Sequence, residues 1–89
     1  MNATTRKELR KAIGLLEDIA PKLDEACAIV ESAAQEMRAK FEALSEKAQE
    51  GERGHRINWI AEALETALSD LEQLALQDVI ENIDNAAGE

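Results

Sequence analysis

The stretch EGERGHRINW, residues 50–59, decides how this chain is arranged, because it interrupts a long pattern of helix-forming residues. It contains two of the four glycines, the only histidine and the only tryptophan. Gly51 is predicted to end the preceding helix, since glycine is the residue most often found just beyond a helix. A short turn over residues 51–55 then leads into a second helix. The chain is therefore expected to reverse direction here.

Upstream of this turn, apolar residues recur in alternating steps of four and three. We call this set the seam; it consists of Leu9, Ile13, Leu16, Ala20, Leu23, Cys27, Val30, Ala34, Met37, Phe41, Leu44 and Ala48. The spacing is that of the a and d positions of a coiled coil, held over more than five heptads. The sequence TRKE, residues 5–8, has the pattern of a capping box and is the expected start of the helix. We therefore predict a long helix whose seam forms the core or a dimer interface.

Pro21 lies inside the seam. A proline within a helix removes one backbone hydrogen bond and clashes with the preceding turn, at a cost of roughly 3 kcal/mol. Either the helix is kinked at Pro21, or it ends near Ala20 and a new helix begins with proline in its first turn. Because the seam continues in phase, we favour the kink. The expected segments are an N-terminal helix or arm over residues 5–20 and its continuation over residues 21–50.

The second helix is expected over residues 56–87 and carries a broader apolar stripe. The stripe consists of Ile57, Ile60, Ala61, Leu64, Ala67, Leu68, Leu71, Leu74, Ala75, Val79, Ile83 and Ala86. A wide stripe indicates packing against more than one neighbouring helix. This favours a helical bundle over a simple two-helix coil.

Helix lengths set the expected architecture, which is a single all-α domain over residues 1–89. A helix over residues 56–86 is about 46 Å long, so its end would lie opposite Pro21 when it folds back antiparallel. The apolar residues of segment 5–20 would then be uncovered, and could fold back as a third helix or pair with a second chain. Because the sixteen alanines bury little area each, we favour a homodimer of two long antiparallel helical hairpins, assembled as a dimeric bundle or coiled coil, over a monomeric three-helix bundle.

Charge is distributed unevenly along the chain, which has a net charge of −9. Residues 1–11 carry Arg6, Lys7, Arg10 and Lys11 against Glu8, whereas residues 57–89 carry eight carboxylates and no Lys or Arg. A general nucleic-acid binder needs a basic surface, so we expect no direct nucleic-acid binding. The basic arm either neutralises the acidic helix within the bundle, or leaves that helix free for a basic partner.

The carboxylates of the second helix form an acidic strip. Its members are Glu62, Glu65, Asp70, Glu72, Asp78 and Glu81, extended by Asp84. Carboxylates three or four residues apart on a helix lie about 5–6 Å from one another, close to the spacing of successive phosphates. In this charge pattern, and not in any motif, the strip resembles small phage- or plasmid-borne inhibitors that act as DNA mimics, including some anti-restriction and anti-CRISPR proteins. The resemblance implies a protein partner, and a basic nucleic-acid-binding protein is the kind of partner expected.

The predicted hairpin tip offers a second set of binding residues, namely Arg53, His55, Arg56 and Trp59. Tryptophan and arginine are the residues most enriched at binding hot spots. Alternatively, Trp59 covers the open end of the bundle, over Leu44 and Ala48. We favour this structural cap.

The sequence contains few of the residues that catalysis or transition-metal binding requires. With one histidine, one cysteine and no tyrosine, no nucleophile–base pair or transition-metal site is expected, and neither is a cofactor. Cys27 is interpreted as a small core residue. One cysteine and an N-terminus without an apolar signal segment indicate the cytoplasm, and no apolar run is long enough for a membrane span. We therefore expect a non-enzymatic protein-binding module, with a structural coiled-coil oligomerisation module or small chaperone as the alternative.

Overall fold

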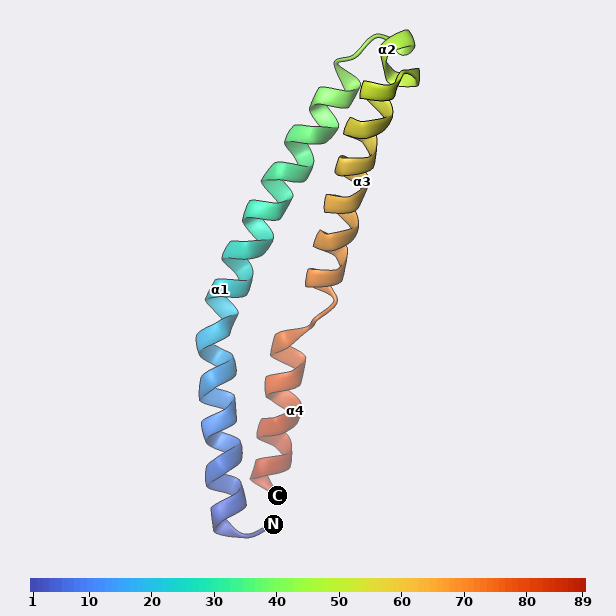
Figure 1. Ribbon diagram of the computed structural model, residues 1–89. Coiled ribbons are helices and arrows are strands. Elements are labelled where there is room, and N and C mark those ends of the chain that lie inside the picture. The colour runs from blue at the N-terminus through green and yellow to red at the C-terminus, as the bar shows by residue number, and fades with distance from the viewer. The chain divides into compact units, whose positions relative to one another are not determined.

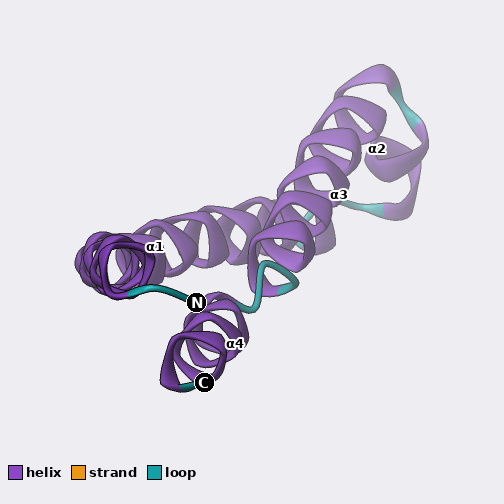
Figure 2. Cartoon of the chain, turned by 90° about the horizontal axis from the view of Figure 1, so that it is seen from below, coloured by secondary structure: helices purple, strands orange, loops and turns teal.

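A computed structural model describes residues 1–89, and every regular element in it is a helix (Figure 2). The helices are α1 (Ala3–Glu42), α2 (Glu46–Glu50), α3 (Glu52–Glu72) and α4 (Leu76–Gly88). The prediction of an all-α protein is confirmed. None of these helices combines the length and the apolarity needed to cross a membrane.

The helices pack into two compact units, and α1 contributes to both. Unit 1 consists of Met1–Glu25 and Leu74–Glu89, so the N-terminal part of α1 packs with α4. Unit 2 is the continuous segment Ala26–Gln73, which contains the rest of α1 together with α2 and α3. Within unit 2 the chain reverses direction at α2, and α3 returns along α1 (Figure 1).

Helix α1 begins one turn earlier than the capping box predicted. The side-chain oxygen Oδ1 of Asn2 accepts a hydrogen bond from the backbone N–H of Thr5 at 2.8 Å. Asparagine is among the best residues for this position, because its short side chain satisfies an N–H that has no partner within the helix. The assignment of Thr5 as the cap was therefore wrong, and the helix starts at Ala3.

Helix α1 also continues through Pro21. Of the two alternatives considered, a helix that ends near Ala20 is wrong. Proline cannot donate to the carbonyl of Glu17, but both residues are exposed, so water can satisfy that carbonyl. The seam explains why the helix persists, because its apolar residues pack on both sides of the proline.

The first helix ends at Glu42 rather than at residue 50, and a separate short helix, α2, follows. Ser45 caps α2, since its hydroxyl accepts a hydrogen bond from the backbone N–H of Ala48 at 3.2 Å. The side-chain amide of Gln49 donates to the carbonyls of Phe41 and Leu44, at 3.1 and 3.3 Å. Phe41 is in the last turn of α1, and its carbonyl also accepts from the backbone N–H of Leu44 at 3.1 Å, so the carbonyls at this helix end have partners outside the helix. Side-chain caps on both sides of the turn therefore stop the helix earlier than the seam indicated.

The turn itself is tighter than predicted. Gly51 ends the short helix α2 rather than the long one, and it also precedes the first residue of α3, Glu52. The predicted loop over residues 51–55 is therefore mostly helical. Gly54 is buried in the first turns of α3, and a Cβ atom added there would lie 2.4 Å from the backbone oxygens of both Ala48 and Gln49. Only glycine allows α2 and α3 to approach this closely.

The predicted helix over residues 56–87 is interrupted between α3 and α4. Ala75 has a φ of 45° and a ψ of 50°, a left-handed conformation that costs a residue with a side chain roughly 1–2 kcal/mol. Helix α4 packs on segment 5–20 within unit 1, where Arg10 Nη1 lies 2.9 Å from Asp84 Oδ1. The expectation that this segment is uncovered was wrong.

Each unit has a very small core. The buried residues are Ile13, Ile80 and Ala87 in unit 1, and Ala34, Ile57 and Ala61 in unit 2. No large side chain is completely buried. Because hydrophobic stabilisation grows with the apolar area removed from water, each unit is held by a narrow line of contacts between two helix faces.

Candidate functional site

An arginine-centred cluster joins α1 to α3 in unit 2. The guanidinium of Arg38 donates to Glu65 through Nη2 at 2.6 Å and through Nε at 3.5 Å. Its Nη1 donates to Oδ1 of Asn58 at 2.8 Å. The planar guanidinium can form these bonds at once because its N–H groups are held in a fixed fork. Arg38 therefore sets the register between α1 and α3.

The cluster changes the acidity of both charged partners. The hydrogen bond from Arg38, aided by the charge of the guanidinium, lowers the pKa of Glu65 below its ordinary value of 4.5. The same hydrogen bond raises the pKa of Arg38. Both groups are thus charged at neutral pH, and Arg38 is occupied within the protein instead of being free for a ligand.

Stability should depend on pH through this pair. A carboxyl group whose pKa is lowered by folding stabilises the protein above its unfolded pKa, and that contribution is lost as the pH falls through the folded pKa. The variant E65Q should therefore be less stable than wild type at pH 7, and the difference should shrink as the pH falls below about 4.5. The free energy of unfolding, measured with urea across this pH range, checks the prediction.

The matched control for this measurement is E72Q, which removes the same charge from α3 at a residue without an ion pair. E72Q should differ little from wild type at pH 7. A difference between E65Q and wild type that stays constant down to the acid end of the range would contradict the prediction.

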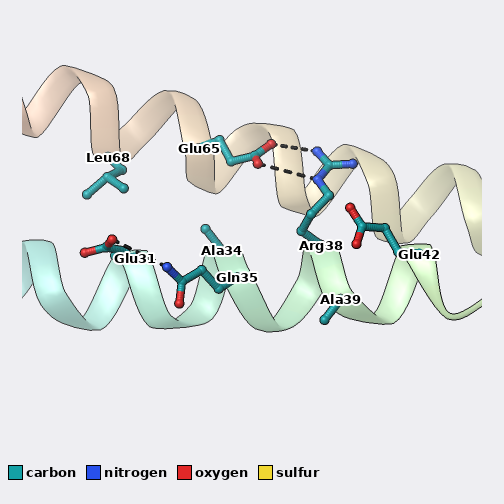
Figure 3. A pocket seen from close by; sticks show the side chains of 8 residues that line it. All are labelled: Glu31, Ala34, Gln35, Arg38, Ala39, Glu42, Glu65 and Leu68. Carbon is teal, nitrogen blue, oxygen red and sulfur yellow. Dashed lines mark hydrogen bonds and ion pairs between the residues drawn. The ribbon is translucent and has the colours of Figure 1, made fainter.

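An open groove of about 310 Å³ lies beside this cluster. Figure 3 shows Glu65 and Leu68 extending into it from α3, opposite Ala34 and Arg38 of α1. Its lining is Glu31, Ala34, Gln35, Arg38, Ala39, Glu42, Glu65 and Leu68. Three carboxylates face one guanidinium, so the groove is acidic with an apolar floor. A cationic group with an aliphatic stem matches this chemistry.

Trp59 lies on the opposite side of α3 from its packing face. It is two residues from both Ile57 and Ala61, or about 160° around the helix from each, and these two residues are buried against α1. The indole is 68% exposed. The interpretation of Trp59 as a cap over Leu44 and Ala48 was therefore wrong. The indole faces outward because residue 59 is already within α3, which begins at Glu52, and lies on the side of the helix away from Ile57 and Ala61.

The other tip residues are exposed in the first turns of α3 and do not lie in a loop. Arg53, His55 and Arg56 all face solvent. Arg56 Nη2 lies 3.7 Å from Glu52 Oε1, four residues earlier. Such an exposed ion pair is weak, so it leaves Arg56 available to other partners. Whether these three residues bind a partner stays a prediction.

The acidic strip is divided between two helices. Glu62, Glu65, Asp70 and Glu72 lie on α3, and Asp78, Glu81 and Asp84 lie on α4. Because residues 73–75 between the two helices are not helical, the carboxylates do not follow one continuous helix with regular spacing. Two of its members also have partners in the protein, since Glu65 pairs with Arg38 and Asp84 with Arg10. Only the Arg10–Asp84 pair comes from the basic arm of residues 1–11, so neutralisation of the whole acidic helix by that arm stays a prediction.

The twelve seam residues are all buried or half-buried, and none is exposed. Ile13 and Ala34 are the most buried of them, and Cys27 is half-buried with a free thiol. The seam thus faces α4 in unit 1 and the α2–α3 pair in unit 2. Its use between two copies of the chain stays a prediction.

Several residues that matter to these surfaces were missed by the sequence analysis. Arg38 and Asn58 gave no signal, because only the register of α1 against α3 brings them together. In α4, the half-buried or buried positions are Leu76, Ile80, Ile83 and Ala87. Their spacing of four, three and four was visible in the sequence. The assumption of one continuous helix instead placed Val79 and Ala86 on the packing side, in place of Ile80 and Ala87.

Comparison of the chain with known protein families, with curated proteins and with solved structures finds no match. The structure also contains no group of three or more His, Cys, Asp or Glu side chains placed to hold a metal ion. Two surfaces of unit 2 are candidate binding surfaces: the outward face of α3 around Trp59, and the acidic groove.

Proposed function

We propose that this protein is a non-enzymatic protein-binding module that presents the outward face of α3 to a basic partner. The exposure of Trp59 carries the proposal. Trp59 is 68% exposed, so most of its large apolar surface is in water. In an isolated protein this exposed surface contributes no hydrophobic stabilisation. Tryptophan buried in an interface is among the strongest contributors to binding. We therefore place Trp59 at the centre of the interface.

The surroundings of Trp59 support a partner with positive charge. Glu62 and Asp70 lie on the same outward side of α3, three and eleven residues beyond the indole. Neither carboxylate is in an ion pair, although Glu62 Oε1 accepts a hydrogen bond from Asn58 Nδ2 at 3.2 Å. An apolar anchor flanked by carboxylates that have no cationic partner fits a basic surface, where complementary charge speeds association and excludes acidic competitors. A basic nucleic-acid-binding protein in the cytoplasm is the proposed target, and a small modulator or inhibitor the proposed role.

The carboxylates should contribute measurably to this binding. The variant E62Q/D70N should bind the partner about tenfold more weakly than wild type at low salt, and the difference should shrink as salt screens the charges. The partner is first captured from native cells with wild-type bait and with the W59A variant as a parallel bait. Proteins retained by the first and lost by the second are candidates, and their affinities are then measured by calorimetry.

The matched control is E46Q/E50Q, which removes two exposed carboxylates from α2. It should bind like wild type. If both double variants bind as wild type does, the acidic surface has no part in recognition. Duplex DNA should compete with the module for the captured protein, and a failure to compete would rule out imitation of a nucleic acid.

A self-association module is the second candidate, favoured by apolar residues of α1 that lie outside the seam. Leu15 and Ile29 are 57% and 63% exposed, and no large side chain is completely buried in either unit. Under this proposal the chain forms one antiparallel hairpin, and two hairpins form a homodimeric bundle or coiled coil. The two candidates differ in a simple way, since only self-association changes the mass of the purified protein.

A further inference from the structure

The acidic groove of unit 2 retains binding capacity after its internal ion pair is formed. Arg38 is held by Glu65 and Asn58. The carboxylates of Glu31 and Glu42 have no cation within the 4.0 Å of a salt bridge. Three carboxylates against one guanidinium leave the groove with two negative charges in excess. Between them, Ala34 and Leu68 supply an apolar floor.

A matching surface exists elsewhere on the same chain. Lys7, Lys11 and Leu15 follow one another at intervals of four residues on α1, so they lie on one face of that helix. All three are exposed, and neither lysine is in an ion pair. Lys11 and Leu15 are each about 160° around the helix from the buried Ile13. We call these three residues the basic stripe; it points away from α4 and has no partner within unit 1.

We propose that the groove binds the basic stripe of a second copy of this chain. Two ammonium groups on the stripe balance the two excess negative charges of the groove. The aliphatic stems of the lysines can lie along the apolar floor while their charged ends reach the carboxylates on its rim. Leu15 adds an apolar side chain, and its burial against the partner removes exposed hydrophobic area from water.

The geometry of α1 requires that the stripe come from another molecule. Lys7 and Glu31 lie on the same helix, 24 residues apart in sequence, and a helix cannot fold back on itself. Every copy carries both surfaces, so under this proposal two copies exchange their basic stripes about a two-fold axis. Such a reciprocal interface closes after two chains and does not propagate into a filament.

This inference gives an interface to the self-association candidate and does not depend on the binding of other proteins by α3. The test is the mass of the protein in solution, by sedimentation equilibrium, for wild type and two charge-reversed variants. Wild type should form dimers that dissociate as salt is raised toward about 1 M, where the Debye length is about 3 Å. K7E/K11E and E31K/E42K should each be monomeric, with the 9.8 kDa mass of one chain.

An equimolar mixture of these two variants is the decisive sample. Each variant alone places like charges in both contacts, whereas the mixed pair places opposite charges in both. The mixture should therefore recover dimers of one molecule of each variant, detected by a fluorescent label on one of them. Recovery also shows that both variants are folded, because unfolded chains would not restore a specific dimer.

The control is D78K/E81K, which makes the same charge reversal on α4, outside both surfaces. It should remain dimeric. A wild-type protein that is monomeric at all concentrations would overturn both self-association and this interface. Dimers that persist in E31K/E42K, or a mixture that stays monomeric, would overturn the groove interface. A D78K/E81K variant that dissociates equally would show a general effect of charge and would overturn it as well.

Discussion

Replacing Gly54 with alanine is expected to lower the free energy of unfolding by about 2 kcal/mol or more. The added Cβ would meet two backbone oxygens at 2.4 Å and the carbonyl carbon of Gln49 at 2.6 Å. These atoms belong to the backbone of α2, so they cannot rotate away as the end of a side chain can. The contact is relieved only if α2 and α3 separate. Urea unfolding followed by circular dichroism measures the loss.

Gly14 provides the matched control for this substitution. It lies within α1, and a Cβ added there meets nothing within 4 Å. Alanine is a better helix former than glycine by about 1 kcal/mol, so G14A should stabilise the protein. The same chemical change thus has opposite expected signs at the two glycines. A G54A variant as stable as wild type would show that the packing of α2 against α3 is looser than the structure indicates.

Replacing Trp59 with alanine should have a large effect on binding and almost none on folding. The indole is largely exposed and faces away from the packing side of α3. Substitutions at such positions usually change stability by less than about 0.5 kcal/mol. Loss of a tryptophan at the centre of an interface typically costs 2 kcal/mol or more, which corresponds to roughly a thirtyfold loss of affinity. Unfolding curves and calorimetric titration with the captured partner measure the two quantities.

The control for W59A is I57V, two residues earlier on the buried face of α3. Removing one methylene from a buried isoleucine costs about 0.5–1.5 kcal/mol of stability, while the outward face is unchanged. I57V should therefore lose stability and keep its affinity, the reverse of W59A. A W59A variant that binds the partner normally would remove the observation on which the proposed function depends.

Helix content and the packing face of α1 could be predicted from the sequence because both depend on local spacing. The seam runs without a missed step from Leu9 to Ala48, and every one of its residues is at least half-buried. The pattern even survives the turn between α1 and α2, since Leu44 and Ala48 remain half-buried although the helix has ended. Periodicity thus reports which side chains face inward, and does not report whether the backbone between them is continuous.

The helix ends were harder to predict, because they depend on interactions that the spacing does not show. The end of α1 is fixed by the cap at Ser45 and by the side chain of Gln49. The end of α3 is followed by Ala75 in a left-handed conformation. Alanine rarely adopts this conformation, so its presence in the sequence does not predict it. Both interruptions lie where the apolar pattern continues, so the pattern concealed them.

The surface features were predicted less well than the fold, and for a different reason. Trp59 was placed correctly in sequence near the turn, but its direction depends on a helix start that was misplaced by four residues. The groove at Arg38 requires residues from two helices that are 27 positions apart in the chain. No local pattern records such a pairing. The carboxylates of the acidic strip could be read from the sequence. Their division between α3 and α4, and the ion pairs of Glu65 and Asp84, could be seen only in the structure.

Unit 1 is built from two segments at opposite ends of the chain, and this affects the order in which the protein folds. Unit 2 is one uninterrupted segment, and its Arg38–Glu65 pair closes over 27 residues. Unit 1 closes through Arg10 and Asp84, which are 74 residues apart. Closing a longer loop costs more chain entropy, and on the ribosome Asp84 emerges long after Arg10. Unit 2 can therefore form before unit 1, and the apolar side of the first helical turns of α1 stays exposed until α4 packs on it.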